Sequence, residues 1–134
     1  MAGKIIADTI ETGAGADIST SYVVNGSAKA WITFNGTGTA SVTSSFNNTS
    51  LTDRGTGAYT YAFVNSMSNG NHSGAGSAKK NDATDDGNQH AQIGGSTSYT
   101  NVSGEQRIAC RRNGGTGEAI DSPAIYAHTH GDLA

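Results

Sequence analysis

The sequence contains little of several residue types that would point to a particular class of protein. Its 134 residues include one proline, one tryptophan and one cysteine, Cys110, so no disulfide can form within the chain. No apolar run approaches the roughly 20 residues that a membrane-spanning helix needs, and the opening stretch MAGKIIADTIE lacks the apolar core of a secretion signal. We therefore expect no membrane insertion, assembly in a cytoplasm, and stability that comes from packing and association.

Charge is also sparse, and it has no strong bias of sign. Only 14% of the residues are charged, and the formal net charge is −3. A nucleic-acid-binding surface normally has a clustered basic face, whereas the basic pairs here are Lys79-Lys80 and Arg111-Arg112. We interpret each pair as a solvated turn or strand edge, and we expect no nucleic-acid partner.

Apolar side chains are too few to give a large core. Hydrophobic residues make up 34% of the chain and aromatic residues 7%, while 19 positions are glycine. The length suits one small domain. However, such a chain can bury little apolar surface, so burial offsets little of the conformational entropy that the chain loses on folding. Association with further copies would supply the missing burial. We therefore expect a homo-oligomer, and favour a homotrimer.

The chain is rich in short alternating runs separated by glycine-rich turns, most clearly over residues 22–63. Asn25-Gly26 and Asn35-Gly36 carry the residue types that tolerate the positive φ angles of tight hairpin turns. Alternation from Ala40 to Phe46 predicts a strand with one buried and one solvated face. The pattern predicts a meander and, for the whole chain, an all-β antiparallel sandwich or jelly-roll-like module.

Two further alternations predict parts of the core. Tyr59, Tyr61 and Phe63 stand at strand spacing, which more often packs a sandwich core than forms a platform for carbohydrate. Cys110 is in phase with Ile108. We interpret it as a small buried hydrophobe and not as a catalytic thiol, because cysteine is commonly buried and no histidine is near it in the sequence.

The N-terminal residues differ from the rest. The run Lys4–Ile10 could form a strand, and Gly13–Ala16 looks like a flexible break. We therefore divide the chain into an extended N-terminal arm, residues 1–20, and a β-sandwich domain, residues 21–134.

Several segments also match a known protein module in order and spacing. They are Asn25–Trp31 (NGSAKAW), Phe34–Thr39 (FNGTGT), Ser45–Asn47, Leu51–Asp53, Gly55–Gly57 and Tyr59-Thr60. In this succession the chain resembles tail-fibre and other virion surface proteins of bacteriophages, marine and cyanophage types among them. Beyond Phe63 the resemblance is carried by a strand at Gln106–Arg112, a turn at Asn113–Gly115 and a final strand at Ala124–His128.

The resemblance implies a structural role at the virion surface, after assembly in the host cytoplasm. The expected function is that of a tail-fibre protein in host attachment, joined through its N-terminal arm to other virion proteins and contacting a host surface glycan or protein. A capsid decoration or knob protein, bound to the head shell by the same arm, is the alternative. Neither role is enzymatic.

Residues 65–104 are dense in Asn, Gly, Ser and Asp, and leave room for a strand or two at most. Loops on a rigid β scaffold often carry recognition residues, although a plain linker would have the same composition. If the loops contact a receptor, the expected residues are Asn69, Asn71, His72, Lys79, Lys80 and His90.

His128-Thr129-His130 is a candidate metal site. Residues two apart on a strand project from the same face, so both imidazoles could bind one ion. Around a threefold axis three copies would present six nitrogens, a set suited to a transition metal. Two exposed histidines near the C-terminus are the simpler interpretation, and no other cofactor is indicated.

A glycan hydrolase would need an opposed pair of carboxyl groups, one with a raised pKa. The carboxylates outside the long loop segment are scattered on predicted turns: Asp53, Glu105, Glu118 and Asp121. We therefore expect no catalytic residues.

Overall fold

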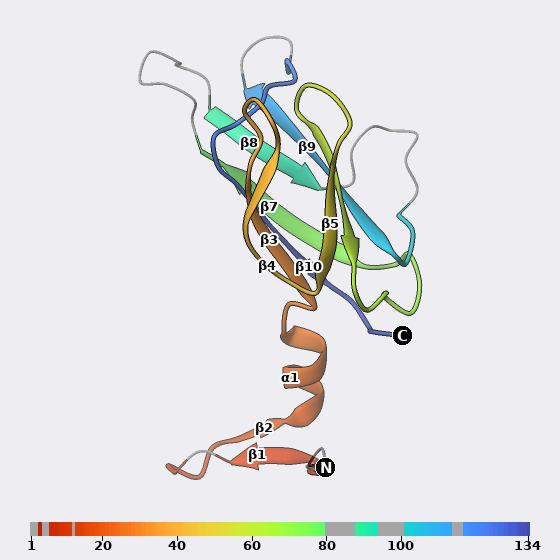
Figure 1. Ribbon diagram of the computed structural model, residues 1–134. Coiled ribbons are helices and arrows are strands. Elements are labelled where there is room, and N and C mark those ends of the chain that lie inside the picture. Colours follow the sequence, from red (N-terminus) through yellow and green to blue (C-terminus); the bar gives the residue numbers. More distant parts are fainter. Residues whose placement is uncertain (1–2, 4–5, 12, 80–87, 94–100, 114–116) are drawn as a thin grey trace.

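The computed structural model describes residues 3, 6–11, 13–79, 88–93, 101–113 and 117–134. Two four-stranded antiparallel sheets pack together as a β-sandwich (Figure 1), which confirms the expected fold class. Sheet I has the order β4 (Ser41–Phe46), β3 (Ala30–Asn35), β10 (Ile125–His130), β7 (Ser73–Ala78). Sheet II has the order β5 (Asn48–Asp53), β6 (Ala58–Phe63), β9 (Glu105–Asn113), β8 (Asn88–Ile93).

The core lies between the two sheets and is aromatic at its centre. Tyr59, Tyr61 and Phe63 are all buried, as their spacing predicts. Phe34 of β3 meets Tyr59 of β6 edge-to-face, with ring centroids 4.9 Å apart, an arrangement that aromatic rings favour. The sandwich is therefore closed by contacts between strands of different sheets.

Cys110 lies in the same core on β9. Its side chain is fully buried, as the phase with Ile108 predicts. Burial, followed by the nearby charge of Asp121, raises the thiol pKa to about 12. The thiol is thus protonated at neutral pH, as expected for a packing residue.

The predicted meander is divided between the sheets at Asn47. This residue has a φ of 53°, in the left-handed region that asparagine tolerates. Its Nδ2 donates to the carbonyl oxygens of Lys29 and Asn65, both at 3.0 Å, and its Oδ1 accepts from the Asn65 N–H at 2.7 Å. The chain therefore leaves sheet I after β4 and enters sheet II as β5.

The two Asn-Gly pairs lie in different kinds of secondary structure. Asn35-Gly36 begins the reversal between β3 and β4, as predicted, and the Asn35 side chain accepts from the Thr37 N–H at 3.1 Å. Asn25-Gly26 is not a hairpin turn, because it ends the helix α1 (Thr20–Gly26). The Ser19 side chain accepts from the Ser21 N–H at the start of this helix, a capping interaction that hydrophobic periodicity does not reveal.

The prediction of a buried face on β4 is wrong. All six of its residues are exposed, including Val42 at 44% and Phe46 at 55%. The reason is its place in the sheet, because β4 is an edge strand that pairs, among the described strands, with β3 alone. Alternation selects which side chains share a face, but it does not provide a second layer to cover that face.

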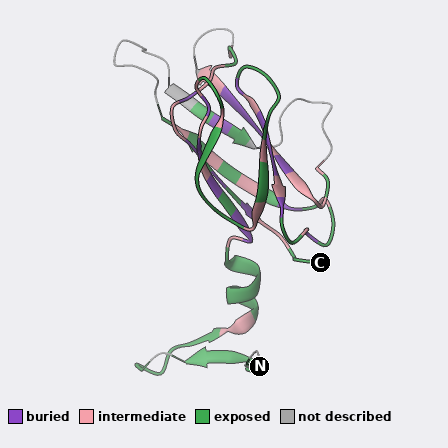
Figure 2. Ribbon diagram, viewed as in Figure 1, coloured by how far each residue is buried: buried purple, intermediate pink, exposed green. Residues whose placement is uncertain are grey.

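The N-terminal residues fold as a hairpin and a helix that stand away from the sandwich (Figure 1). β1 (Thr9–Glu11) pairs with β2 (Asp17–Ser19), and α1 follows at once. No residue of α1 is buried, and Figure 2 shows this part of the chain almost wholly exposed. Among the described residues, the part that stands apart thus runs to Gly26, beyond the limit of residue 20 given to the predicted arm, and from here on we call residues 6–11 and 13–26 the arm.

Lys29 joins the arm to the sandwich. Its Nζ donates to the Ser27 hydroxyl at 2.7 Å and to the Val24 carbonyl of α1, while its backbone N–H donates to Thr129 of β10 at 2.8 Å. The side chain is 9% exposed. A buried lysine thus caps the end of the helix beside sheet I.

The strands predicted in the later part of the chain agree with the described residues, whereas most of the turn predicted at Asn113–Gly115 lies outside them. β7 and β8 are two strands within residues 65–104, and the strands expected at Gln106–Arg112 and Ala124–His128 correspond to β9 and β10. No helix among the described residues is long and apolar enough to span a membrane.

Candidate functional site

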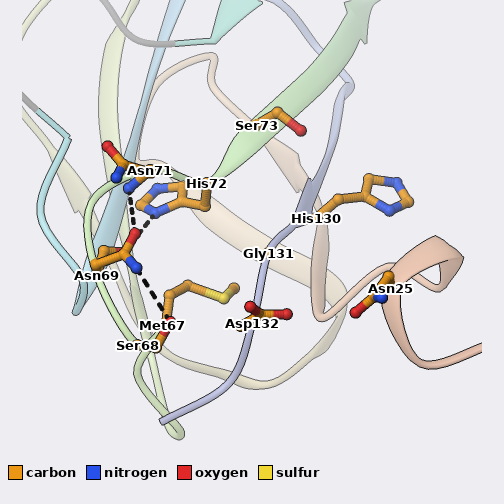
Figure 3. A pocket seen from close by; sticks show the side chains of 10 residues that line it. All are labelled: Asn25, Met67, Ser68, Asn69, Asn71, His72, Ser73, His130, Gly131 and Asp132. Atoms are coloured by element: carbon orange, nitrogen blue, oxygen red, sulfur yellow. Dashed lines mark hydrogen bonds between the residues drawn. The ribbon is translucent and has the colours of Figure 1, made fainter. Parts of the chain in front are cut away.

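A polar hollow of about 450 Å³ lies where the arm meets the sandwich (Figure 3). Three segments far apart in sequence form it: the end of α1, the connection from β6 to β7, and the residues around the end of β10. The lining residues are Asn25, Met67, Ser68, Asn69, Asn71, His72, Ser73, His130, Gly131 and Asp132. Three predicted receptor-contact residues thus share one cavity with a predicted metal ligand.

The connection from β6 to β7 is held in a defined shape. The Asn69 Oδ1 accepts from the Asn71 N–H at 2.7 Å, which closes a tight turn. Gly70 packs so closely that a Cβ atom would lie 2.3 Å from the Asn101 carbonyl oxygen, so only glycine fits. The Ser68 N–H donates to the Asp132 carbonyl at 2.7 Å, which ties this connection to the C-terminal residues.

His72 is a wall of the hollow and not an exposed contact. It is 6% exposed, and its ring packs edge-to-face on Phe63 at 5.8 Å between centroids. Nδ1 lies 3.4 Å from the Asn69 carbonyl oxygen, while Nε2 has no hydrogen-bond partner among the described residues. A ligand on the surface would therefore meet the neighbouring asparagines before this imidazole.

The other predicted receptor-contact residues do not form one surface. Asn69, Asn71, Lys79 and His90 are exposed, and Lys80 lies outside the described residues. Lys79 follows the end of β7 that is distant from Asn71, and His90 is in sheet II, opposite Arg111 of β9. The first hollow thus gathers only the Asn69–His72 part of the predicted set.

His128 and His130 do lie together. Their ring centroids are 5.2 Å apart on the outer face of β10, and Thr129 between them is buried against Tyr61. No group of three or more His, Cys, Asp or Glu able to hold a metal occurs in the described part of the chain. A metal at this pair would therefore need ligands from elsewhere, and the site stays a prediction.

The scattered carboxylates have structural partners. Asp121 Oδ1 accepts from the Tyr59 hydroxyl at 2.6 Å and from the Gly57 N–H at 2.7 Å. Burial, and then the bond to Asp121, raise the pKa of Tyr59 well above its usual value. Asp53 accepts from the Gly55 N–H in a turn, and Glu105 lies 4.0 Å from the Arg107 guanidinium.

A second, smaller hollow lies on the outer face of sheet II. Its volume is about 190 Å³, and its lining includes Arg54, Arg107 and Arg111. Sequence reasoning missed Arg54 and Arg107. It was wrong in placing Arg111-Arg112 at a solvated turn or strand edge, because both residues lie within β9, an inner strand of sheet II. The even spacing of Arg107 and Arg111, which puts both on one face of a strand, was a usable signal. It also missed Asn25 and Asp132 in the first hollow, which no local pattern connects with residues 67–73.

Comparisons of the chain with protein-family models, with curated proteins and with solved structures find no match.

Proposed function

We propose that this protein is a structural component of a bacteriophage virion: a tail-fibre protein at the virion surface, working in host attachment as a homo-oligomer, in the first instance a homotrimer. The resemblance of residues 25–60 to the module of phage surface proteins supports the virion role. The observation that carries the proposal is the arm, because it exposes apolar side chains, no residue of α1 is buried, and the arm meets the sandwich only at its end, near Lys29 and Asn25, among the described residues.

The arm needs contacts from outside the chain to be stable. Two-stranded hairpins and helices as short as α1 are marginal in water by themselves. Ile10, Ile18, Tyr22 and Val24 are 43–71% exposed on it. Burying these side chains against further copies, or against another virion protein, would stabilise the hairpin and the helix together.

The outer face of sheet I supports association for a second reason. Trp31 of β3 and Phe46 of β4 are direct cross-strand partners, 38% and 55% exposed, and Tyr126 of β10 is 46% exposed nearby. β4 contains no charged residue and no proline, the usual protection of an edge strand. A second copy covering this face would bury both the aromatic side chains and the open edge.

A capsid decoration or knob protein is the second candidate. It is favoured by the same arm, since a hairpin and helix projecting from a sandwich could bind a head shell and leave the sandwich outside. In this role the arm contacts the shell, whereas in a tail fibre it contacts other copies or the tail.

A cryo-electron microscopy map of the intact virion tests the proposal directly. Density for intertwined copies of this chain on the tail would support the fibre, and density on the capsid lattice would establish the decoration role. Absence of the chain from purified virions would refute both. A variant truncated before Ser27 then shows whether the arm is the anchor, because the sandwich should fold but no longer bind the particle.

The exposed loops suggest how the protein would contact a host. We propose that Asn69 and Asn71 at the rim of the first hollow contact a surface glycan or protein. Purified protein should then compete with phage for adsorption to host cells, and Asn71→Ala should weaken the competition. Thr52→Ala is the matched control, because Thr52 is an exposed polar residue of β5 outside the predicted receptor-contact set.

A further inference from the structure

The arginines of this chain are concentrated on one sheet. The sequence has four, and three of them line the hollow on the outer face of sheet II. The whole chain has a net charge of −3, so this local excess of positive charge is opposite in sign to the rest of the molecule. A grouping of this kind on a cavity wall needs a reason beyond solubility.

The register of the strands explains how the hollow forms. Arg107, Ala109 and Arg111 alternate with the buried Ile108 and Cys110, so all three face outward on β9. Four residues of strand place the two arginines about 13 Å apart, and the small side chain of Ala109 lies between them. A cavity is therefore open between two cations.

Small residues of β6 continue the floor of the hollow. Ala58 pairs with Ala109, and Thr60 pairs with Arg107. Thr60 and Ala109 are only 2% and 8% exposed, although they lie on the outer face of the sheet. The floor is thus already shielded from water, which strengthens electrostatic contacts made above it.

Two of the arginines are held in position by the protein. Arg54 Nε donates to the Thr60 hydroxyl at 3.0 Å, and an Arg111 terminal nitrogen donates to the Gly117 carbonyl at 2.9 Å. A guanidinium has five N–H donors, so a single bond fixes its position and leaves others for a ligand. Holding the side chains in advance lowers the entropy cost of binding.

The acidic groups nearby do not cancel this charge. Glu105 lies 4.0 Å from Arg107, and both side chains are partly exposed. Asp121 is used by Tyr59 and Gly57. Between the described residues, one ion pair thus offsets part of the charge of the three arginines.

We propose that this hollow binds an oxoanion, a carboxylate or phosphate group, through Arg54, Arg107 and Arg111. Guanidinium groups match the planar geometry of both anions and bind them with two parallel hydrogen bonds. The volume is below the roughly 300 Å³ of pockets for larger ligands, so it suits one such group with the ring or short chain that bears it. His90, beside Arg111 on β8, borders the same surface. The site is independent of the virion role, and its test needs only the purified chain.

Nuclear magnetic resonance titration at constant ionic strength tests the site. Inorganic phosphate and glucuronate are added separately, with chloride as the reference anion. The expected result is saturable shifts at the backbone amides of 57–60 and 107–111 with at least one probe, which also shows whether phosphate or carboxylate is preferred. Shifts that do not saturate, or that spread evenly over the surface, would overturn the proposal.

Charge-matched variants separate a site from general attraction. Arg107→Gln and Arg111→Gln should each weaken binding by about tenfold or more, since each removes hydrogen bonds to a charged group. Lys79→Gln removes the same charge from an exposed residue of the other sheet and should change binding less than twofold. Equal losses in all three would contradict the site.

Folding of the variants has to be separated from binding. Arg107→Lys keeps the charge but loses the planar fork, so it should also weaken binding while thermal unfolding is unchanged. Full affinity in Arg107→Lys and in Arg111→Lys would exclude a geometric site and overturn the proposal.

Discussion

The Tyr59 hydroxyl donates a hydrogen bond of 2.6 Å to the Asp121 carboxylate, and it contacts the Gly36 carbonyl at 3.0 Å as well. One phenol thus connects β6 of sheet II with the segment before β10 and with the end of β3. We expect Tyr59→Phe to lower the free energy of unfolding by about 1.5–3 kcal/mol, the usual range for a hydrogen bond to a charged group. Urea unfolding measures this, with Tyr126→Phe on an exposed tyrosine as control. Equal stability of the two variants would contradict the assigned role.

The buried ionisable groups predict a loss of stability at high pH. Burial raises the pKa of Tyr61 to about 12 and that of the Cys110 thiol to about 12, from ordinary values of 10.0 and 9.0. A raised folded pKa means that the folded state holds its proton more tightly. The stabilisation is complete below the unfolded pKa and is lost as the pH rises toward 12.

Urea unfolding at pH 7, 9 and 10.5 measures this effect. We expect little change from these groups up to pH 9 and a decline above it. The free energy of unfolding of Tyr61→Phe should fall less between pH 7 and pH 10.5 than that of the unaltered protein, because the variant has one buried acidic group fewer. A decline as steep as that of the unaltered protein would show that other groups cause it.

Asn47 combines a positive φ with three hydrogen bonds, so two variants can separate these contributions. Asn47→Gly keeps the backbone conformation but loses the side-chain bonds, whereas Asn47→Ala loses both. We expect Asn47→Ala to be the less stable by about 1 kcal/mol. The comparison uses chemical unfolding of both, and a more stable alanine variant would contradict the strained corner.

The exposed aromatic pair on sheet I gives a prediction for association. If copies cover this face, Phe46→Lys should weaken self-association by about tenfold or more, because it places a charge in an apolar contact. Unfolding of the separated chain should be unaffected, since Phe46 is 55% exposed. Light scattering after size-exclusion chromatography gives the mass. Ser45→Lys on the same strand is the control, because its side chain projects to the opposite face of β4. Loss of association only in Phe46→Lys would exclude a general effect of charge.

Much of the fold could be predicted because a strand repeats its pattern every two residues. Tyr59, Tyr61 and Phe63 had to share a face, and a face so apolar had to be inside. Asn25-Gly26 was misread because the same dipeptide suits a helix end and a hairpin. The exposure of β4 could not be predicted, since alternation describes one strand and burial depends on its neighbours.

The candidate sites were less accessible to sequence reasoning for a related reason. His128 and His130 could be placed on one face by local spacing alone. The first hollow depends on Asn25, Asn71 and Asp132 coming together, and this requires the whole topology of the sandwich. Arg107 and Arg111 were the intermediate case, because their common face could be predicted from their spacing, whereas the position of Arg54 beside Thr60 could not.

The position of Asn25 links the arm to the first hollow. Asn25 belongs to α1, while Asp132 belongs to the sandwich, and both line the same cavity. A ligand that contacts both residues would stabilise the one angle between arm and sandwich at which it binds most tightly. The size of this stabilisation is the difference between its binding free energies at that angle and at others. Fixing that angle by anchoring the arm changes the affinity of the hollow by the same factor, because such coupling is reciprocal. Ligand binding in the first hollow and anchoring of the arm would therefore be coupled through Asn25.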